Sequence, residues 1–198
     1  MARPAAADYR KLMIELGVEK IKQGLPVKML EMTKELGISN ALGHFYFNGQ
    51  SELANASWRE LFLSSVKEDF ERLDQYGEAT NWEGVAALVY EVFSPERTAV
   101  RQTHLRAIIQ SFSDDELKSI MATSHQVTRD LWVEILNKYA ERGVLKLRIP
   151  VDQIALMFVA APFGITAIAG EPDEDGRKQA YEAWLGTVIA LTDPDFKP

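Results

Sequence analysis

Few side chains in this 198-residue sequence are of a type that catalyses a reaction or binds a metal. It contains three histidines and no cysteine, which excludes disulfides, thiolate catalysis and cysteine-based zinc sites. No Glu-x-x-His pair of a di-iron bundle, Gly-x-Ser-x-Gly motif, P-loop or dinucleotide fingerprint occurs. The acidic runs at 68–71 and 173–175 are more typical of solvated helix faces and helix starts than of metal ligands. We therefore expect no enzyme, no metal and no cofactor.

The residues around a glycine turn near the N-terminus favour recognition by hydrogen bonding. Gly37 can adopt the positive φ that ends a helix, and the branched Ile38 can fill the gap between two helices. Ser39 can cap the next helix, which begins with the small residues Asn40 and Ala41. A helix with such a start can enter a major groove. The pattern predicts a helix-turn-helix with helices over 9–23, 27–36 and 40–47.

The stretch MTKELGISNALGHFYFNGQSEL, Met32–Leu53, resembles the signature of the TetR family of bacterial transcription regulators. The turn, the aromatic run His44–Phe47 and the helix start Ser51–Leu53 occupy the places of that signature. The resemblance implies an all-α fold with two domains. Residues 1–50 would form the three-helix DNA-binding domain, and residues 51–198 a helical ligand-binding and dimerisation domain.

The resemblance also implies contacts to double-stranded operator DNA. In and beside the second helix of the motif, five side chains can donate hydrogen bonds and two lysines can contact phosphate. Ala41 lies in the first turn of that helix, which would enter the major groove. The donors are Ser39, Asn40, His44, Tyr46 and Gln50, and the lysines are Lys28 and Lys34. For His44, a partly buried ring is the alternative to contact with phosphate.

The sequence departs from the family pattern in this region. Gly43 replaces the usual apolar residue of the recognition helix, and no Lys or Arg occurs between Lys34 and Arg59. Without a cation, this helix cannot make the common bidentate contact to guanine. We expect binding that is weak, prefers A·T or is lost. Phe45 would either contact thymine methyl groups or fill the core in place of the side chain missing at Gly43.

Helical spacing continues through the remainder of the chain, whereas strand signals are almost absent. The pattern predicts an all-α protein of about nine helices. Thr80 with Glu83 and Ser113 with Glu116 read as capping boxes, and Ser94 precedes a proline at a helix start. The later helices are expected over 51–76, 80–93, 94–112, 113–142, 150–170 and 175–191.

Charge is divided unevenly along the chain. Residues 1–58 carry a net charge of +1 and the remaining residues −8, within a total of −7. The first part therefore has the right sign for approaching a polyanion, although its field is weak.

In the fold that the resemblance implies, two histidines on separate helices come near several aromatic side chains. A pocket formed by these residues suits an apolar effector with one polar handle. The alternative is that both histidines are surface or core residues without a ligand. The candidate residues are Tyr90, Phe93, His104, His125, Trp132 and Phe163.

The segment Ile154–Gly170 is uncharged over 17 residues and includes Pro162 and Gly164. A buried helix in a core or an interface fits it better than a membrane span, since acidic residues border it and no basic cluster does. Together with the last helix it either packs inside one subunit or forms the four-helix dimer interface that the resemblance implies. The residues expected in that interface are Phe158, Ile165, Tyr181, Trp184 and Val188.

These observations predict a TetR-like, ligand-responsive transcription regulator that binds operator DNA as a homodimer. The absence of cysteine and of a secretory signal is consistent with the cytoplasm. The alternative is a helical dimer of the same fold that has lost specific DNA binding and acts through ligand or protein contacts. A repressor is the expected form of such a regulator, although activation stays open.

Overall fold

The computed structural model describes residues 6–169 and 173–192, which form nine helices and no strand. The predicted all-α class is therefore confirmed. The chain divides into two compact units. The first comprises the chain up to Ser65 together with Gln110–Met121, and the second comprises Val66–Ile109 together with the residues from Ala122 onwards.

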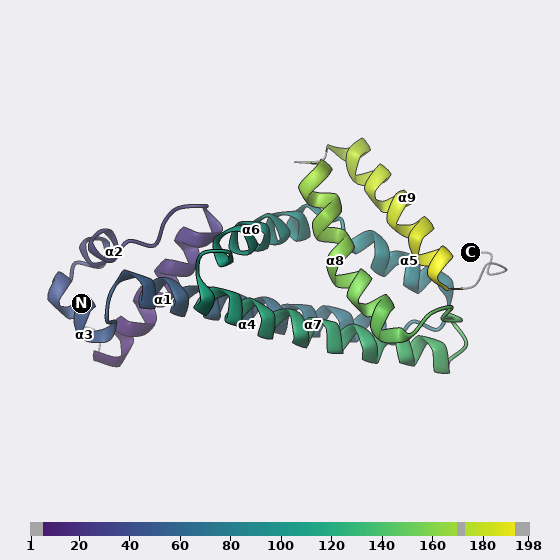
Figure 1. The fold of residues 1–198 in the computed structure, drawn as a ribbon, viewed down its shortest axis with the longest axis horizontal. Coiled ribbons are helices and arrows are strands. Elements are labelled where there is room, and N and C mark those ends of the chain that lie inside the picture. The colour runs from purple at the N-terminus through teal and green to yellow at the C-terminus, as the bar shows by residue number, and fades with distance from the viewer. Residues whose placement is uncertain (1–5, 170–172, 193–198) are drawn as a thin grey trace. The chain divides into compact units, whose positions relative to one another are not determined.

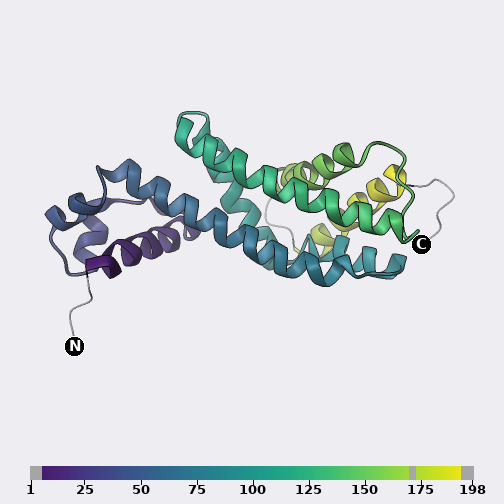
Figure 2. The same cartoon turned by 90° about the horizontal axis from the view of Figure 1, so that it is seen from below.

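The first unit contains the first three helices and the beginning of the long fourth one (Figure 2). Their bounds are α1 Ala6–Lys22, α2 Met29–Glu35, α3 Asn40–Tyr46 and α4 Gln50–Gly77. Helices α2 and α3 contact each other, and α1 contacts α2. This is the predicted helix-turn-helix with a supporting first helix.

The turn between α2 and α3 is closed by backbone hydrogen bonds around a left-handed glycine. Gly37 has φ +66°, a conformation that costs glycine nothing. The N–H of Gly37 donates to the carbonyl of Lys34 (3.1 Å), and the N–H of Ile38 donates to the carbonyl of Thr33 (2.9 Å). These two bonds make a Schellman ending. The Ser39 hydroxyl then accepts from the N–H of Leu42 at 3.2 Å and caps α3.

Two glycines allow helices of this unit to approach closely. A Cβ at Gly17 of α1 would lie 2.1 Å from the Ser57 Oγ of α4. A Cβ at Gly43 of α3 would lie 2.7 Å from the Met29 Sδ and 2.7 Å from the Thr33 Cγ2, both on α2. The glycine at position 43, which departs from the family pattern, is thus explained by the packing of α3 against α2.

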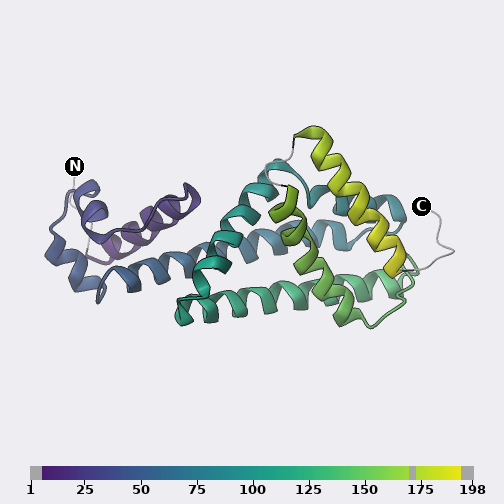
Figure 3. The ribbon, with the colours of Figure 1, turned by 45° about the horizontal axis from the view of Figure 1, so that its top comes forward.

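The second unit contains the later helices, of which α8 and α9 lie side by side and α5 contacts α9 (Figures 1 and 3). Their bounds are α5 Trp82–Glu91, α6 Pro95–Ser111, α7 Asp115–Glu141, α8 Val151–Ala169 and α9 Glu174–Leu191. Helices α4, α6 and α7 each belong partly to both units. The last predicted residue of the apolar helix, Gly170, lies outside the described residues.

Two predicted capping residues are displaced by one position. The side chain of Asn81, not Thr80, accepts from the N–H of Gly84 at 3.1 Å and caps α5. The side chain of Asp114, not Ser113, accepts from the N–H of Leu117 at 2.9 Å at the start of α7. Asn is a stronger N-cap than Thr, whereas Asp and Ser are about equal, so position decides the second case: Asp114 stands immediately before α7, as Asn81 does before α5. The cap predicted at Ser94 is confirmed by its bond from the N–H of Arg97 at 3.3 Å.

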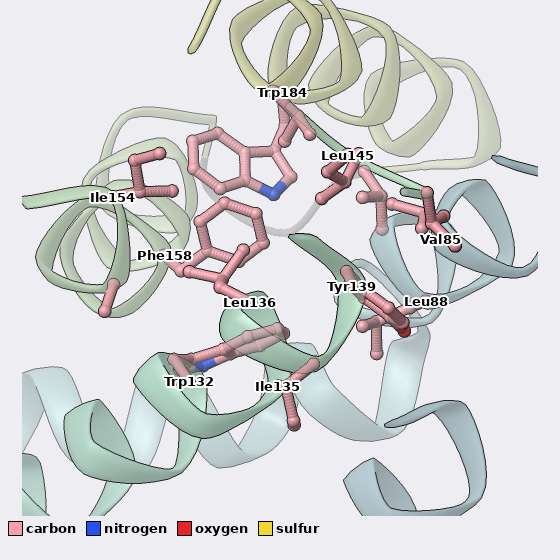
Figure 4. Close-up of a cluster of buried hydrophobic side chains, with 14 of the residues drawn as sticks. Val85, Leu88, Trp132, Ile135, Leu136, Tyr139, Leu145, Ile154, Phe158 and Trp184 are labelled. Carbon is pink, nitrogen blue, oxygen red and sulfur yellow. The ribbon is translucent and has the colours of Figure 1, made fainter. Parts of the chain in front are cut away.

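The core of the second unit is built around three large rings (Figure 4). Phe158 of α8 lies between Trp132 of α7, at 4.7 Å between centroids, and Trp184 of α9, at 5.0 Å. Edge and tilted contacts of this kind add to the stabilisation that burial provides. The rings therefore join α7, α8 and α9.

Helix α8 is only partly covered by the rest of its own chain. Its segment Val151–Ile168 is long and apolar enough to span a membrane by composition, and 28% of that segment is buried. Leu156, Met157 and Ile168 are exposed large side chains on this helix. A core helix of a soluble protein passes the same test of composition, so the length and composition of α8 do not establish a membrane span.

The close approach at Gly43 gives a first prediction. Replacing Gly43 with Ala places a methyl group against α2, and this overlap should lower the free energy of unfolding by about 1–3 kcal/mol. The higher helix propensity of Ala returns about 1 kcal/mol, so we expect a net decrease of up to about 2 kcal/mol. Urea denaturation measures the change.

Thr33→Ser is the matched second substitution, because it removes the Cγ2 atom that the new methyl group meets and keeps the hydroxyl that donates to the carbonyl of Leu30. In the double variant we expect part of the lost stability to return. Strict additivity of the two changes would contradict a steric clash at this crossing.

Candidate nucleic-acid interface and ligand cavity

Helix α3 has one buried side and one exposed side. Gly43 and Phe47 are buried, whereas the side chains expected to meet DNA lie on the outside. Those that the structure shows exposed are Lys28, Lys34, Ser39, Asn40, Ala41, His44, Phe45 and Gln50, and Tyr46 is half-buried. The exposed set brings hydrogen-bond donors and acceptors together with small and aromatic groups.

The structure resolves the two alternatives for Phe45. Its side chain is 77% exposed, and its ring meets the Tyr46 ring edge-on at 5.2 Å. Phe45 therefore does not replace a core residue at Gly43, where Met29 and Thr33 take up the space. His44 is likewise exposed.

The two lysines differ in their surroundings. The Nζ of Lys28 lies 2.8 Å from the Oε1 of Glu31, and the Lys28 side chain does not cap α2. Lys34 forms no ion pair with any described residue and is exposed in the last turn of α2. Of the two, Lys34 has the ammonium group more readily available to a phosphate.

The second unit encloses a cavity of about 100 Å³ among α4–α8. Four of the six predicted ligand-binding residues line it: His104, His125, Trp132 and Phe163. The Phe163 ring lies 5.8 Å from the His104 ring and 5.9 Å from the His125 ring. A second, more open hollow of about 410 Å³ shares His125, Val159 and Phe163 with this cavity.

Two predicted ligand-binding residues lie outside the cavity lining. Tyr90 is 64% exposed, and its ring meets Tyr181 edge-on at 5.3 Å. Phe93 is a core residue with 5% exposure whose ring lies 5.3 Å from the guanidinium carbon of Arg101. Phe93 therefore packs behind Arg101, which lines the cavity, but is not itself part of the lining.

The sequence reasoning missed the cations of the cavity. Arg72, Arg97 and Arg101 line it, and Glu91, which pairs with Arg72 at 3.1 Å, is the acid among the described lining residues. Arg97, Arg101 and His104 are spaced i, i+4 and i+7 along α6, which places them on one helix face. That spacing was visible in the sequence and was the available signal.

Burial keeps the histidines of the cavity neutral. Desolvation, followed by the nearby His125, Arg97 and Arg101, lowers the pKa of His104 to about 4. Burial also lowers the pKa of His125. For Arg101, burial and then the charge of Arg97 lower the pKa to about 10. At neutral pH the cavity therefore contains charged arginine and uncharged imidazoles.

Three of the five residues expected in a dimer interface are buried inside a single chain. Phe158, Trp184 and Val188 are exposed by 6%, 1% and 0%, so they have no surface to offer a partner. The apolar stripe on α9 is where α9 packs on its own core. Ile165 and Tyr181 are half-buried.

No group of three or more metal-ligating side chains occurs in the part of the chain that the structure describes.

Comparison with known proteins identifies the fold. No family model and no curated protein matches the sequence. Three solved structures resemble the chain over nearly its whole length: a TetR transcription regulator from Haloarcula marismortui, a protein assigned to the TetR family of transcriptional regulators from Mesorhizobium loti, and a protein assigned as a transcriptional regulator from Pseudomonas aeruginosa. In that order, the TM-scores are 0.69, 0.74 and 0.70, at 14%, 14% and 18% identity.

The matches cover 94%, 96% and 95% of this chain and 100%, 99% and 93% of the other chains, in the same order. At these identities the likeness shows the fold. The chain has the fold of TetR-type transcription regulators.

The low pKa of His104 predicts how stability depends on pH. An unfolded histidine takes up a proton near pH 6.5, whereas folded His104 does so only near pH 4. Between these values the unfolded state binds more protons, so stability falls as the pH falls. We expect a loss of about 2 kcal/mol between pH 7 and pH 5 from this group.

Urea denaturation of the wild type and of His104→Gln across that pH range checks this expectation. The variant should lose less stability on acidification, although His125 leaves it a residual slope of the same sign. Equal slopes in the two proteins would show that His104 does not contribute.

Proposed function

We propose that this protein is a ligand-responsive transcription regulator that binds operator DNA as a homodimer. The observation that supports this most directly is the exposed face of α3, the second helix of a well-formed helix-turn-helix, in a chain with a TetR-type fold. The cavity of the second unit is the proposed effector site. The proposed compartment is the cytoplasm.

DNA recognition in this proposal depends on α3 entering the major groove. Its capped N-terminus begins with Asn40 and Ala41, and one turn later come His44 and Phe45, all exposed. An asparagine side chain can pair with adenine, and an apolar group such as Ala or Phe can contact the thymine methyl group. These side chains favour an A·T-containing half-site.

The proposed dimer uses the uncovered faces of α8 and α9. Large apolar side chains are exposed on α8, and Gly164 and Gly186 face open space in the single chain. Covering such a surface contributes roughly 25 cal/mol per Å² removed from water. A dimer also supplies two helix-turn-helix motifs, one for each half-site. The interface residues we propose are Leu156, Met157, Ile165 and Ile168 of α8 and Tyr181 of α9.

One observation favours a second function. Helix α3 carries no Lys or Arg, and a protein of this fold that had lost operator binding would need none. Such a protein would act through its ligand or through protein contacts. DNA binding separates the two proposals.

A mobility-shift titration against DNA flanking the protein's own gene, at two salt concentrations, tests the regulator. We expect specific binding that weakens steeply as salt rises, because phosphate contacts release counterions. No preference over random DNA would instead support the second function.

Lys34→Ala refines this test. Because Lys34 is free of ion pairs with described residues, its loss should weaken binding to all sequences and lower the salt slope by roughly 0.9 per protomer. Lys146→Ala, an exposed lysine of the second unit, is the charge-matched control and should leave the slope unchanged.

Sedimentation tests the dimer. Ile168→Glu places a charge on a side chain that is 90% exposed in one chain and covered in the proposed dimer. We expect dimerisation to weaken by at least roughly tenfold, because a buried charge without a partner is unfavourable. Ile109→Glu, at an isoleucine of α6 that is 70% exposed, is the control and should stay dimeric. A wild-type monomer at micromolar concentration would contradict the dimer.

A further inference from the structure

The cavity of the second unit is lined by a buried guanidinium group that has no acid beside it. The Arg101 side chain is 6% exposed, and no ion pair joins it to any described carboxylate. Its hydrogen-bond partners are the hydroxyl groups of Thr166 and Thr98 and the carbonyl of Val92. All three are uncharged. A buried charge is usually compensated by an opposite one, since its desolvation is unfavourable.

Part of the Arg101 donor set is unused. A guanidinium has five N–H groups, of which one donates to Thr166 at 2.8 Å, one to Val92 and one to Thr98 at 3.2 Å. Two N–H groups therefore lack an acceptor among the described residues. A carboxylate accepts from arginine with two oxygens at once, which is the number of donors left vacant.

The other charges around the cavity have the same sign on balance. Arg72 pairs with Glu91, while Arg97 adds a second cation close enough to Arg101 to lower its pKa. Three arginines and one glutamate thus line the cavity, a net charge of +2. An anion would lower the repulsion between Arg97 and Arg101.

Most of the remaining lining is apolar. Leu88, Val92, Trp132, Phe158 and Phe163 are among the walls. The cavity of about 100 Å³ is smaller than the roughly 150 Å³ that accommodates benzene, so a ring fits only by extending into the adjoining hollow of about 410 Å³ beside His125 and Phe163. The Nε2 of His125 is buried without a hydrogen-bond partner among the described residues, which leaves one neutral polar atom for a ligand.

We propose that the effector of this protein is a small apolar monocarboxylate, with a body no larger than a single ring, whose carboxylate binds Arg101. This inference rests on the proposed ligand-responsive function, since it names the chemical class that the cavity takes. The carboxylate accepts from the two vacant N–H groups, and the apolar body lies against Trp132 and Phe163.

A purely structural role for Arg101 explains only part of this arrangement. Its bond to Val92 lies at the C-terminal end of α5, where a cation is favourable, and its bond to Thr166 joins α6 to α8. Neither bond requires two further donors on a cavity wall or the neighbouring Arg97.

Calorimetric titration of the full-length protein without DNA tests the proposal. The probes are benzoate, isovalerate, benzamide and acetate. Benzoate or isovalerate should bind, and benzamide should bind roughly ten- to hundredfold more weakly than benzoate, because a neutral amide forms weaker bonds to a cation. Acetate, which lacks the apolar body, should not compete at equal concentration. Equal affinity for benzoate and benzamide, or no binding of either acid at millimolar concentration, overturns the proposal.

Substitutions of arginine test whether the anion binds in the cavity. Arg101→Gln should reduce benzoate affinity roughly ten- to hundredfold, while Arg106→Gln, an exposed arginine on the same helix that does not line the cavity, should not. Because Arg101→Gln removes a bond between helices and could therefore reduce the yield of folded protein, Arg101→Lys is the second variant. Lysine keeps the positive charge but lacks the two parallel N–H donors of a guanidinium, so this variant should bind benzoate more weakly than the wild type. Unchanged affinity in both folded variants would put the anion elsewhere.

The outcomes separate this inference from the regulator itself. If benzoate binds but specific DNA binding is absent, the ligand class is supported and the proposal of operator binding is contradicted. Specific DNA binding with no acid bound contradicts the ligand class alone.

Discussion

The contact of Phe158 with Trp132 and Trp184 is the interaction on which the second unit depends. One ring on α8 meets an indole of α7 at 4.7 Å and an indole of α9 at 5.0 Å, so three helices are held by two contacts. Phe158 and Trp132 are also walls of the cavity. Because a packed core rearranges between discrete states instead of deforming continuously, a ligand that moved Phe158 would also move the helices whose outer faces we propose for the dimer.

The cavity owes its chemistry to burial. The same desolvation that lowers the pKa of His104 to about 4 leaves Arg101 charged, because a guanidinium begins from a much higher pKa. The cavity thus holds neutral imidazoles and a permanent cation within one apolar enclosure. A charge in such surroundings interacts more strongly with an opposite charge than it would in water, which gives the carboxylate proposal its expected selectivity.

In the first unit the determining constraint is close approach at a glycine. Gly43 lies against Met29 and Thr33 where a Cβ would overlap both, and Gly37 closes the turn with a positive φ. Together they set the rotation of α3 about its axis. That rotation exposes His44 and Phe45 and buries Phe47.

The sequence by itself determined the local features. The glycine turn at Gly37, the caps at Ser39 and Ser94 and the order of the helices depend on interactions between residues a few positions apart, so they could be predicted. Where Asn81 and Asp114 replaced the expected caps, the prediction missed by one residue because neighbouring polar side chains compete for the same N–H groups.

Only the tertiary structure decided which face of each helix is covered. Helical spacing predicted apolar stripes that included Trp184 and Val188 but not whether a partner or their own chain covers them, and both lie in their own core. Phe45 lies outside because Gly43 leaves no vacancy for it. Arg101, ordinary in the sequence, is a buried cation because α5, α6 and α8 meet around it. Burial depends on contacts between segments distant in sequence, and local spacing does not specify which segments meet.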